Sequence, residues 1–257
     1  MKKYLQIFFY SFKDNTKSQK ELLVRCSFFF VILFIFSNLW SATNPNQVGI
    51  DQAKMIWYLY ITETIVISLP IIQFEIESDI RSGDVAYYLI KPVNYLFLKL
   101  AENLGVYHFR FFVLLTLGFF ACYFLSAGHI PSLLNITTSF LMSYIAGIVI
   151  LIFQASIGIM AFKLQDCSAL FWIWQRSSFL LGGLLMPLNL YPDWLRKIAN
   201  YLPFSSMISE PASLMLQFKY VEFIQLFFKL FGWMTFGGLL AYYLYGKVLK
   251  QIKINGG

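Results

Sequence analysis

Long apolar runs alternate with short polar segments along this chain. Each run is long enough to cross a bilayer as a helix, which takes about 20 residues. The runs predict six membrane-spanning helices over about 26–42, 56–74, 104–126, 136–162, 169–188 and 223–245. We therefore expect an all-α integral membrane protein with one transmembrane domain over residues 1–257.

Two further segments are amphipathic rather than uniformly apolar. Residues 1–25 carry Leu5, Phe8, Phe9 and Phe12 at helical spacing among lysines, a pattern typical of an in-plane amphipathic helix in the headgroup layer. The interval from about 191 to 220 is rich in proline and serine. We expect extracytoplasmic or re-entrant helices there, between the fifth and sixth spans.

Charge sets the orientation. Only 13% of the residues are charged against 58% hydrophobic, which excludes an ordinary soluble domain. With the N-terminus inside, thirteen of the 20 Lys and Arg residues fall in cytoplasmic segments and four in outer ones. Positive residues favour the cytoplasm, so both termini are predicted to be cytoplasmic. The net charge of +7 indicates contact with anionic membrane lipid, not with nucleic acid.

The sequence offers no catalytic or metal-binding constellation. The three cysteines lie far apart and outside any cluster with metal-ligand spacing. The pair Gly246-Lys247 is followed by Val248 and lacks the upstream glycine of a phosphate-binding loop. We expect no catalytic residue, no metal and no cofactor in this chain.

The longest predicted cytoplasmic loop has an ordered pattern of turn signals. Its acidic half, from Glu75, can extend the second helix out of the membrane until Gly83 ends it in a left-handed conformation. Asp84 can then begin a short helix over 85–90, which Lys91-Pro92 stops. Such a helix is shaped to press into a groove of another protein; the plainer interpretation is a solvated turn.

The loop also resembles a known family. An acidic residue followed by Asp-Ile-Arg-Ser-Gly at 79–83, then Tyr-Leu and Lys-Pro at 88–92, is similar to the loop before the third span of ABC-2 type permeases. A second match is Gly182-Gly183, Met186-Pro187 and Tyr191-Pro192, followed by Leu202-Pro203-Phe204. Together these motifs resemble the six-span bacterial export permeases that pair with a separate ATPase subunit.

The resemblance implies a function and a set of partners. In that family the loop holds a coupling helix that docks on the ATPase. Two ATPase subunits, which bind ATP and Mg, would drive this chain and a second permease chain, identical or paralogous, in the inner membrane, and would export a hydrophobic or amphipathic substrate. The ATPase-coupling residues that it implies here are Glu77, Asp79, Ile80, Arg81, Gly83, Tyr87, Tyr88, Leu89 and Pro92.

Polar residues inside the predicted spans are the other candidates. A charge at the bilayer centre is costly, so these side chains should face protein or water. The candidates for a translocation pathway or a dimer interface are Glu63, Gln175, Arg176 and Ser177. Alternatively, Glu63 is a structural partner of Arg110 or Arg176, and Arg176 reaches the headgroups.

Two other functional classes remain open. The first is an ATPase-independent channel or scaffold, with Glu63 and Arg176 lining a pore. The second is a membrane enzyme, which the lack of a nucleophile, a metal set or an acid/base pair disfavours.

Overall fold

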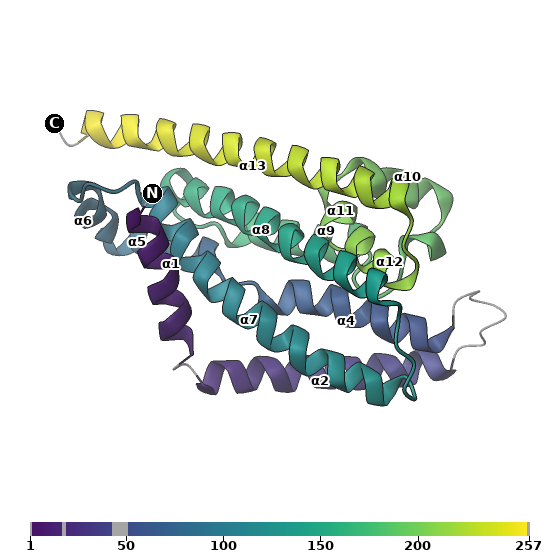
Figure 1. The fold of residues 1–257 in the computed structure, drawn as a ribbon. Coiled ribbons are helices and arrows are strands. Elements are labelled where there is room, and N and C mark those ends of the chain that lie inside the picture. Colours follow the sequence, from purple (N-terminus) through teal and green to yellow (C-terminus); the bar gives the residue numbers. More distant parts are fainter. Residues whose placement is uncertain (1, 17–18, 43–50, 256–257) are drawn as a thin grey trace.

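The protein is a bundle of helices. The computed structural model describes residues 2–16, 19–42 and 51–255, and this part contains no strand. Both ends of the chain lie with α6 at one end of the bundle, and α10 lies at the opposite end (Figure 1). The helices are α1 (Lys2–Asn15), α2 (Gln19–Ala42), α4 (Gln52–Ser68), α5 (Ile72–Ser82), α6 (Asp84–Ile90), α7 (Tyr95–Leu125), α8 (Leu133–Leu164), α9 (Ser168–Leu181), α10 (Asp193–Tyr201), α11 (Pro203–Met207), α12 (Ser209–Leu216) and α13 (Tyr220–Asn255), with a 3-10 turn at Leu188–Leu190.

Five helical stretches are long and apolar enough to cross a membrane: Lys20–Ala42, Gln52–Ser82, Tyr95–Leu125, Leu133–Leu164 and Tyr220–Leu249. The expectation of a multi-pass helical membrane protein is thus confirmed. The range 169–188 differs, because α9 has only 14 residues. Its length of about 21 Å is below the ~30 Å of a hydrocarbon core. Gly182 and Gly183, the latter at φ +66°, end the helix inside the apolar run.

Helix α4 is the centre of the bundle. Every side chain from Met55 to Ile65 is buried, so this helix is enclosed on all sides rather than on one face. It packs against α2, α7 and α12, while α5 and α13 pack against α8. The polar Glu63 is therefore held in a helix that is buried along most of its length.

A break separates α4 from α5. The predicted span 56–74 is interrupted, because Pro70 lacks a backbone N–H and the chain is extended at Leu69. Arg25 of α2 donates hydrogen bonds to the carbonyls of Ile67 and Leu69, at 2.9 and 3.4 Å. Backbone carbonyls in a membrane need such partners, so Arg25 stabilises the break.

The N-terminal amphipathic segment is shorter than predicted. Helix α1 ends at Asn15, and residues from Gln19 onward, expected in the in-plane helix 1–25, belong to the first long helix α2. Residues 1, 17 and 18 lie outside the described part. Helix α1 packs along the first part of α7, from Tyr4 on Phe97 to Phe12 on Phe109, and approaches it most closely at Gly105, where a Cβ would clash with the carbonyl oxygen of Phe8.

The segment after α10 is buried. Residues 203–209 are all enclosed, and α12 packs between α4 and α8. The serines that make this segment look polar bond within the protein: Ser139 of α8 donates to the carbonyl of Pro211 at 2.8 Å, and Ser206 to that of Pro203 at 2.8 Å. An extracytoplasmic surface helix fits α10, which is largely exposed, but not the buried residues 203–209.

We predict that Gly105→Ala destabilises the packing of α1 on α7. The added methyl group meets backbone, which cannot move aside as a side chain can. Loss of 1–3 kcal/mol, about the cost of overpacking, should appear as faster proteolysis within α1. The matched control is Gly238→Ala, where a Cβ meets nothing within 4 Å; equal proteolysis of the two variants would contradict the prediction.

Candidate functional site

The turn between α5 and α6 forms as the sequence predicts. Gly83 adopts φ +80° and donates its N–H to the carbonyl of Ile80 at 3.2 Å, which ends α5. Ser82 Oγ contacts Asp84 Oδ2 at 2.7 Å at the start of α6. Helix α6 ends at Lys91, just before Pro92. We call α5, this turn and α6 the α5–α6 corner.

Glu77 ties the corner to the loop between α8 and α9. One carboxylate oxygen contacts Arg81 at 2.9 Å. The other accepts hydrogen bonds from the backbone N–H and the thiol of Cys167, at 3.1 and 2.8 Å. Arg81 also donates to the carbonyl of Gln165 at 2.9 Å and lies 3.6 Å from Asp166. These hydrogen bonds and ion pairs hold α5 against the α8–α9 loop.

The Glu77 carboxylate also affects the pKa of the Cys167 thiol. Burial, together with the neighbouring Glu77, raises the pKa of Cys167 to about 12. Cys167 therefore stays a neutral thiol at physiological pH and serves as a hydrogen-bond donor rather than a nucleophile.

Asp79 ties the corner to α7. Its Oδ2 lies 2.7 Å from Lys99 Nζ and accepts a hydrogen bond from Tyr95 at 2.8 Å. Glu75 adds a further link, because Asn103 donates to its carboxylate at 2.9 Å. Most of this network is removed from solvent, so it fixes α5 on α7.

The remaining coupling candidates divide between the core and the surface. Ile80 and Tyr88 pack against the core, whereas Arg81, Gly83 and Pro92 are exposed. Tyr87 is 62% exposed on the outer face of α6. The side chain of Leu89 lies outside the described residues. Ile90, three residues after Tyr87, is 85% exposed, and the sequence reasoning missed it although i, i+3 spacing puts both on one face.

Within the bundle, Glu63 and Gln175 line one cavity. This cavity, the apolar groove, has a volume of about 540 Å³ between α2, α4 and α9, and Phe28, Ile32 and Phe179 dominate its wall. Glu63 is 2% exposed and makes no hydrogen bond or ion pair within the described residues. Nearer the α6 end lies a second space of about 170 Å³, the inner cavity, whose mostly apolar lining includes the polar side chains of Gln73, Gln154, Gln175 and Ser178.

The other residues of the predicted pathway lie elsewhere. Arg176 is exposed and its guanidinium lies 5.5 Å from the ring centroid of Trp172. Ser177 lines neither cavity, whereas its neighbour Ser178 does. The alternative partners of Glu63 are not observed, because Arg110 pairs with Glu21 at 2.8 Å.

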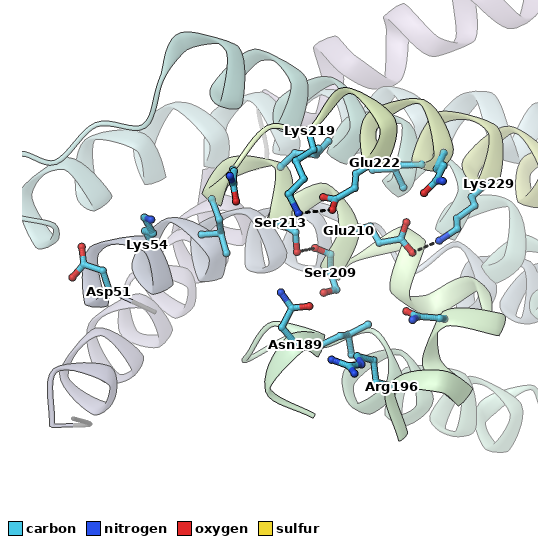
Figure 2. Close-up of a pocket in the computed structure, with 17 residues that line it drawn as sticks. Asp51, Lys54, Asn189, Arg196, Ser209, Glu210, Ser213, Lys219, Glu222 and Lys229 are labelled. Atoms are coloured by element: carbon cyan, nitrogen blue, oxygen red, sulfur yellow. Dashed lines mark hydrogen bonds and ion pairs between the residues drawn. The ribbon is translucent and has the colours of Figure 1, made fainter. Parts of the chain in front are cut away.

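A polar pocket of about 510 Å³ lies at the α10 end, which the sequence reasoning did not single out. Figure 2 shows two ion pairs in its wall, Lys219 with Glu222 and Lys229 with Glu210, each at 2.8 Å. The second pair joins α12 to α13. The only sequence signal for this pocket is the run of charges that flanks the last apolar stretch.

Comparison with known proteins identifies the family of this chain. The sequence model of the ABC-2 family transporter protein matches residues 22–256. This chain belongs to the ABC-2 transporter family. A search of the curated proteins finds no match.

Family membership fits the chemistry of the site. An ABC-2 permease is the transmembrane component of a transporter and is not itself catalytic; permeases of this family pair with an ABC ATPase subunit. Among the residues that the structure describes, no group of three His, Cys, Asp or Glu side chains could hold a metal ion. What the permease does offer is an exposed short helix and enclosed polar groups inside its bundle.

We predict that Asp79→Ala destabilises the permease by about 3 kcal/mol, because the buried Lys99 then keeps only Glu102, at 3.7 Å, as an acidic partner. Unfolding in mixed detergent micelles measures the change. Asp193→Ala removes an exposed pair on α10 and should cost less than about 1 kcal/mol. A similar loss in both variants would show that the Asp79 contact contributes no more than a surface pair.

We further predict that Cys167 resists alkylation at pH 8. A pKa of about 12 against an ordinary value of 9.0 lowers the thiolate fraction about a thousandfold. Glu77→Gln removes the carboxylate that raises the pKa and should speed the reaction of Cys167 with a maleimide, followed by peptide mass analysis. If the wild-type Cys167 thiol reacts at the rate of a free cysteine, its contact with Glu77 is refuted.

Proposed function

We propose that this chain is the membrane-spanning permease subunit of an ATP-driven ABC exporter. It works with a separate ATPase subunit and moves a hydrophobic or amphipathic substrate out of the cytoplasm. Family membership supports the permease role. The observation that carries the proposal is the α5–α6 corner, which is exposed on one side and bonded to the bundle on the other.

The topology that we propose has six crossings and both termini in the cytoplasm. The α8–α9 loop contacts α5 at the α6 end, and the chain reaches α10 at the opposite end, so the segment 168–192 passes from one end to the other (Figure 1). Only its first part is helical. The lysine-rich N-terminal segment and α6 share one end, as cytoplasmic segments should.

The exposed face of α6 is the proposed docking surface for the ATPase. Tyr87 and Ile90 are large side chains of the kind that anchor interfaces. Lys91 lies 4.0 Å from the ring centroid of Tyr87, which adds a positive charge beside the aromatic surface. A partner groove that accepts these residues would bury most of α6.

The internal contacts of the corner provide the transmission. Movement of α6 is passed to α7 through Asp79 and Lys99, and to the α8–α9 loop through Glu77 and Cys167. Helix α9, which follows that loop, forms one wall of both cavities. Docking of the ATPase can thereby change the shape of the proposed pathway, in which Glu63 and Gln175 lie.

The assembly would contain two copies of the ATPase and a second permease chain, identical or paralogous. ATP and Mg²⁺ would be bound by the ATPase. Helix α13 can pack against a partner chain or against lipid, because only 17% of its most apolar stretch is buried within this chain.

We predict that Tyr87→Ala combined with Ile90→Asp reduces co-purification of the ATPase at least tenfold in mild detergent, because an anchor is lost and a charge enters the interface. The control is Tyr201→Ala at the α10 end, a tyrosine that is 85% exposed against 62% for Tyr87, which should leave association unchanged. Intact association of the double variant would refute docking on α6. Recovery of the wild-type chain with no ATPase would favour a channel or scaffold.

A further inference from the structure

The inner cavity and the apolar groove are adjoining spaces. Arg25, Val66, Gln175 and Phe179 line both of them. The inner cavity carries four uncharged polar side chains, Gln73, Gln154, Gln175 and Ser178, among apolar neighbours such as Trp174 and Ile208, whereas the lining of the groove is aromatic and aliphatic apart from Arg25, Glu63 and Gln175. An occupant of both spaces would therefore need a polar part and an apolar part.

The inner cavity contains unpaired polar atoms. Gln73 is fully buried, and neither its side-chain oxygen nor its nitrogen has a hydrogen-bond partner in the described structure. Gln154, 6% exposed, leaves its side-chain oxygen unpaired. Unpaired amides are costly in an apolar interior. Two such residues from different helices at one cavity point to a hydrogen-bonding occupant.

That occupant is uncharged. The only ionic side chain in the wall of the inner cavity is Arg25. Its guanidinium is engaged by Glu21 at 3.0 Å and by the carbonyls of Ile67 and Leu69, so its charge is already compensated. No free cation or carboxylate is left to bind a charged head there. The volume of about 170 Å³ corresponds to roughly six groups of the size of water.

The groove suits a hydrocarbon chain. Its wall follows α2 from Val24 to Phe36, which is about 18 Å along the helix axis. Leu184 and Leu185 also line it. Glu63 is an acidic residue in this otherwise mostly apolar wall. An ammonium group would be its natural partner, so the test includes a cationic probe.

We infer that the two cavities together bind a single-chain amphipath with a small uncharged head rich in hydroxyl or amide groups. The head occupies the inner cavity beside Gln73 and Gln154, and the chain lies in the apolar groove. That such a molecule is cargo rests on the proposed function, whereas the binding site itself does not.

The test uses three probes with the same twelve-carbon chain: monolauroylglycerol, laurate and dodecylammonium. Saturable binding to the purified full-length permease in nanodiscs should favour monolauroylglycerol at least tenfold over either charged probe. Gln73→Leu and Gln154→Leu should each weaken its binding about tenfold, the effect of one or two lost hydrogen bonds. Both variants should keep the thermal stability of the unliganded protein, since each removes an unpaired amide.

Two controls locate the site. Ile32→Trp fills the groove and should abolish binding, whereas Ile35→Trp changes an exposed residue of the same helix and should not. Gln6→Leu, on α1, controls for the loss of an amide outside the cavities. Equal binding of the three probes, or binding that none of the cavity variants alters, would overturn the inference and leave a cavity filled by water or bulk lipid.

The proposed function is tested separately. Stimulation of ATP hydrolysis by monolauroylglycerol in the complex with the ATPase reports on transport, while probe binding uses the permease alone. Selective probe binding by a permease that has no associated ATPase would refute the proposed exporter and support the binding site. An associated ATPase without selective probe binding would refute the binding site and leave the exporter supported.

Discussion

The hydrogen bonds from Arg25 to the carbonyls of Ile67 and Leu69 are the constraint on which the rest of the structure depends. A helix inside a bilayer can end only where its open carbonyls find donors. Arg25 supplies them, and Glu21 balances its charge. This arrangement lets the helix break at Leu69–Ile71, after which α5 packs on α8.

The break links the two candidate sites. Residues on both sides of it, from Val66 to Gln73, line the inner cavity, and α5, which begins there, leads to α6. Because α5 is bonded to α7 and to the α8–α9 loop, the corner cannot shift by itself. In the proposed function, a force applied to α6 would reach the break and α9 through these contacts.

Local chemistry made the α5–α6 corner predictable. Gly83 and Lys91-Pro92 act on the backbone within a few residues, and the helices begin and end where these signals lie. The apolar runs also located the five long helices. By contrast, the high hydropathy of the run 169–188 predicted one spanning helix. Hydropathy does not register that Gly182 and Gly183 end the helix within the run.

The partners of buried polar groups were beyond local reasoning. The pairing of Arg110 with Glu21 requires α2 and α7 to be neighbours, and the meeting of Gln73 with Gln154 requires α5 to pack on α8. Sequence spacing within one helix carries none of this information. It correctly marked Glu63 and Gln175 as unusual, but it could not show that they share a wall while Arg176 does not.

The short helix α9 has a consequence for the surrounding bilayer. At 14 residues it is less than half as long as α8, its predecessor, which has 32. Beyond α9 the apolar run continues to Leu188 without α-helix. Non-helical backbone at membrane depth is tolerated only where protein or water covers it, so bilayer lipid must be kept away from residues 182–187.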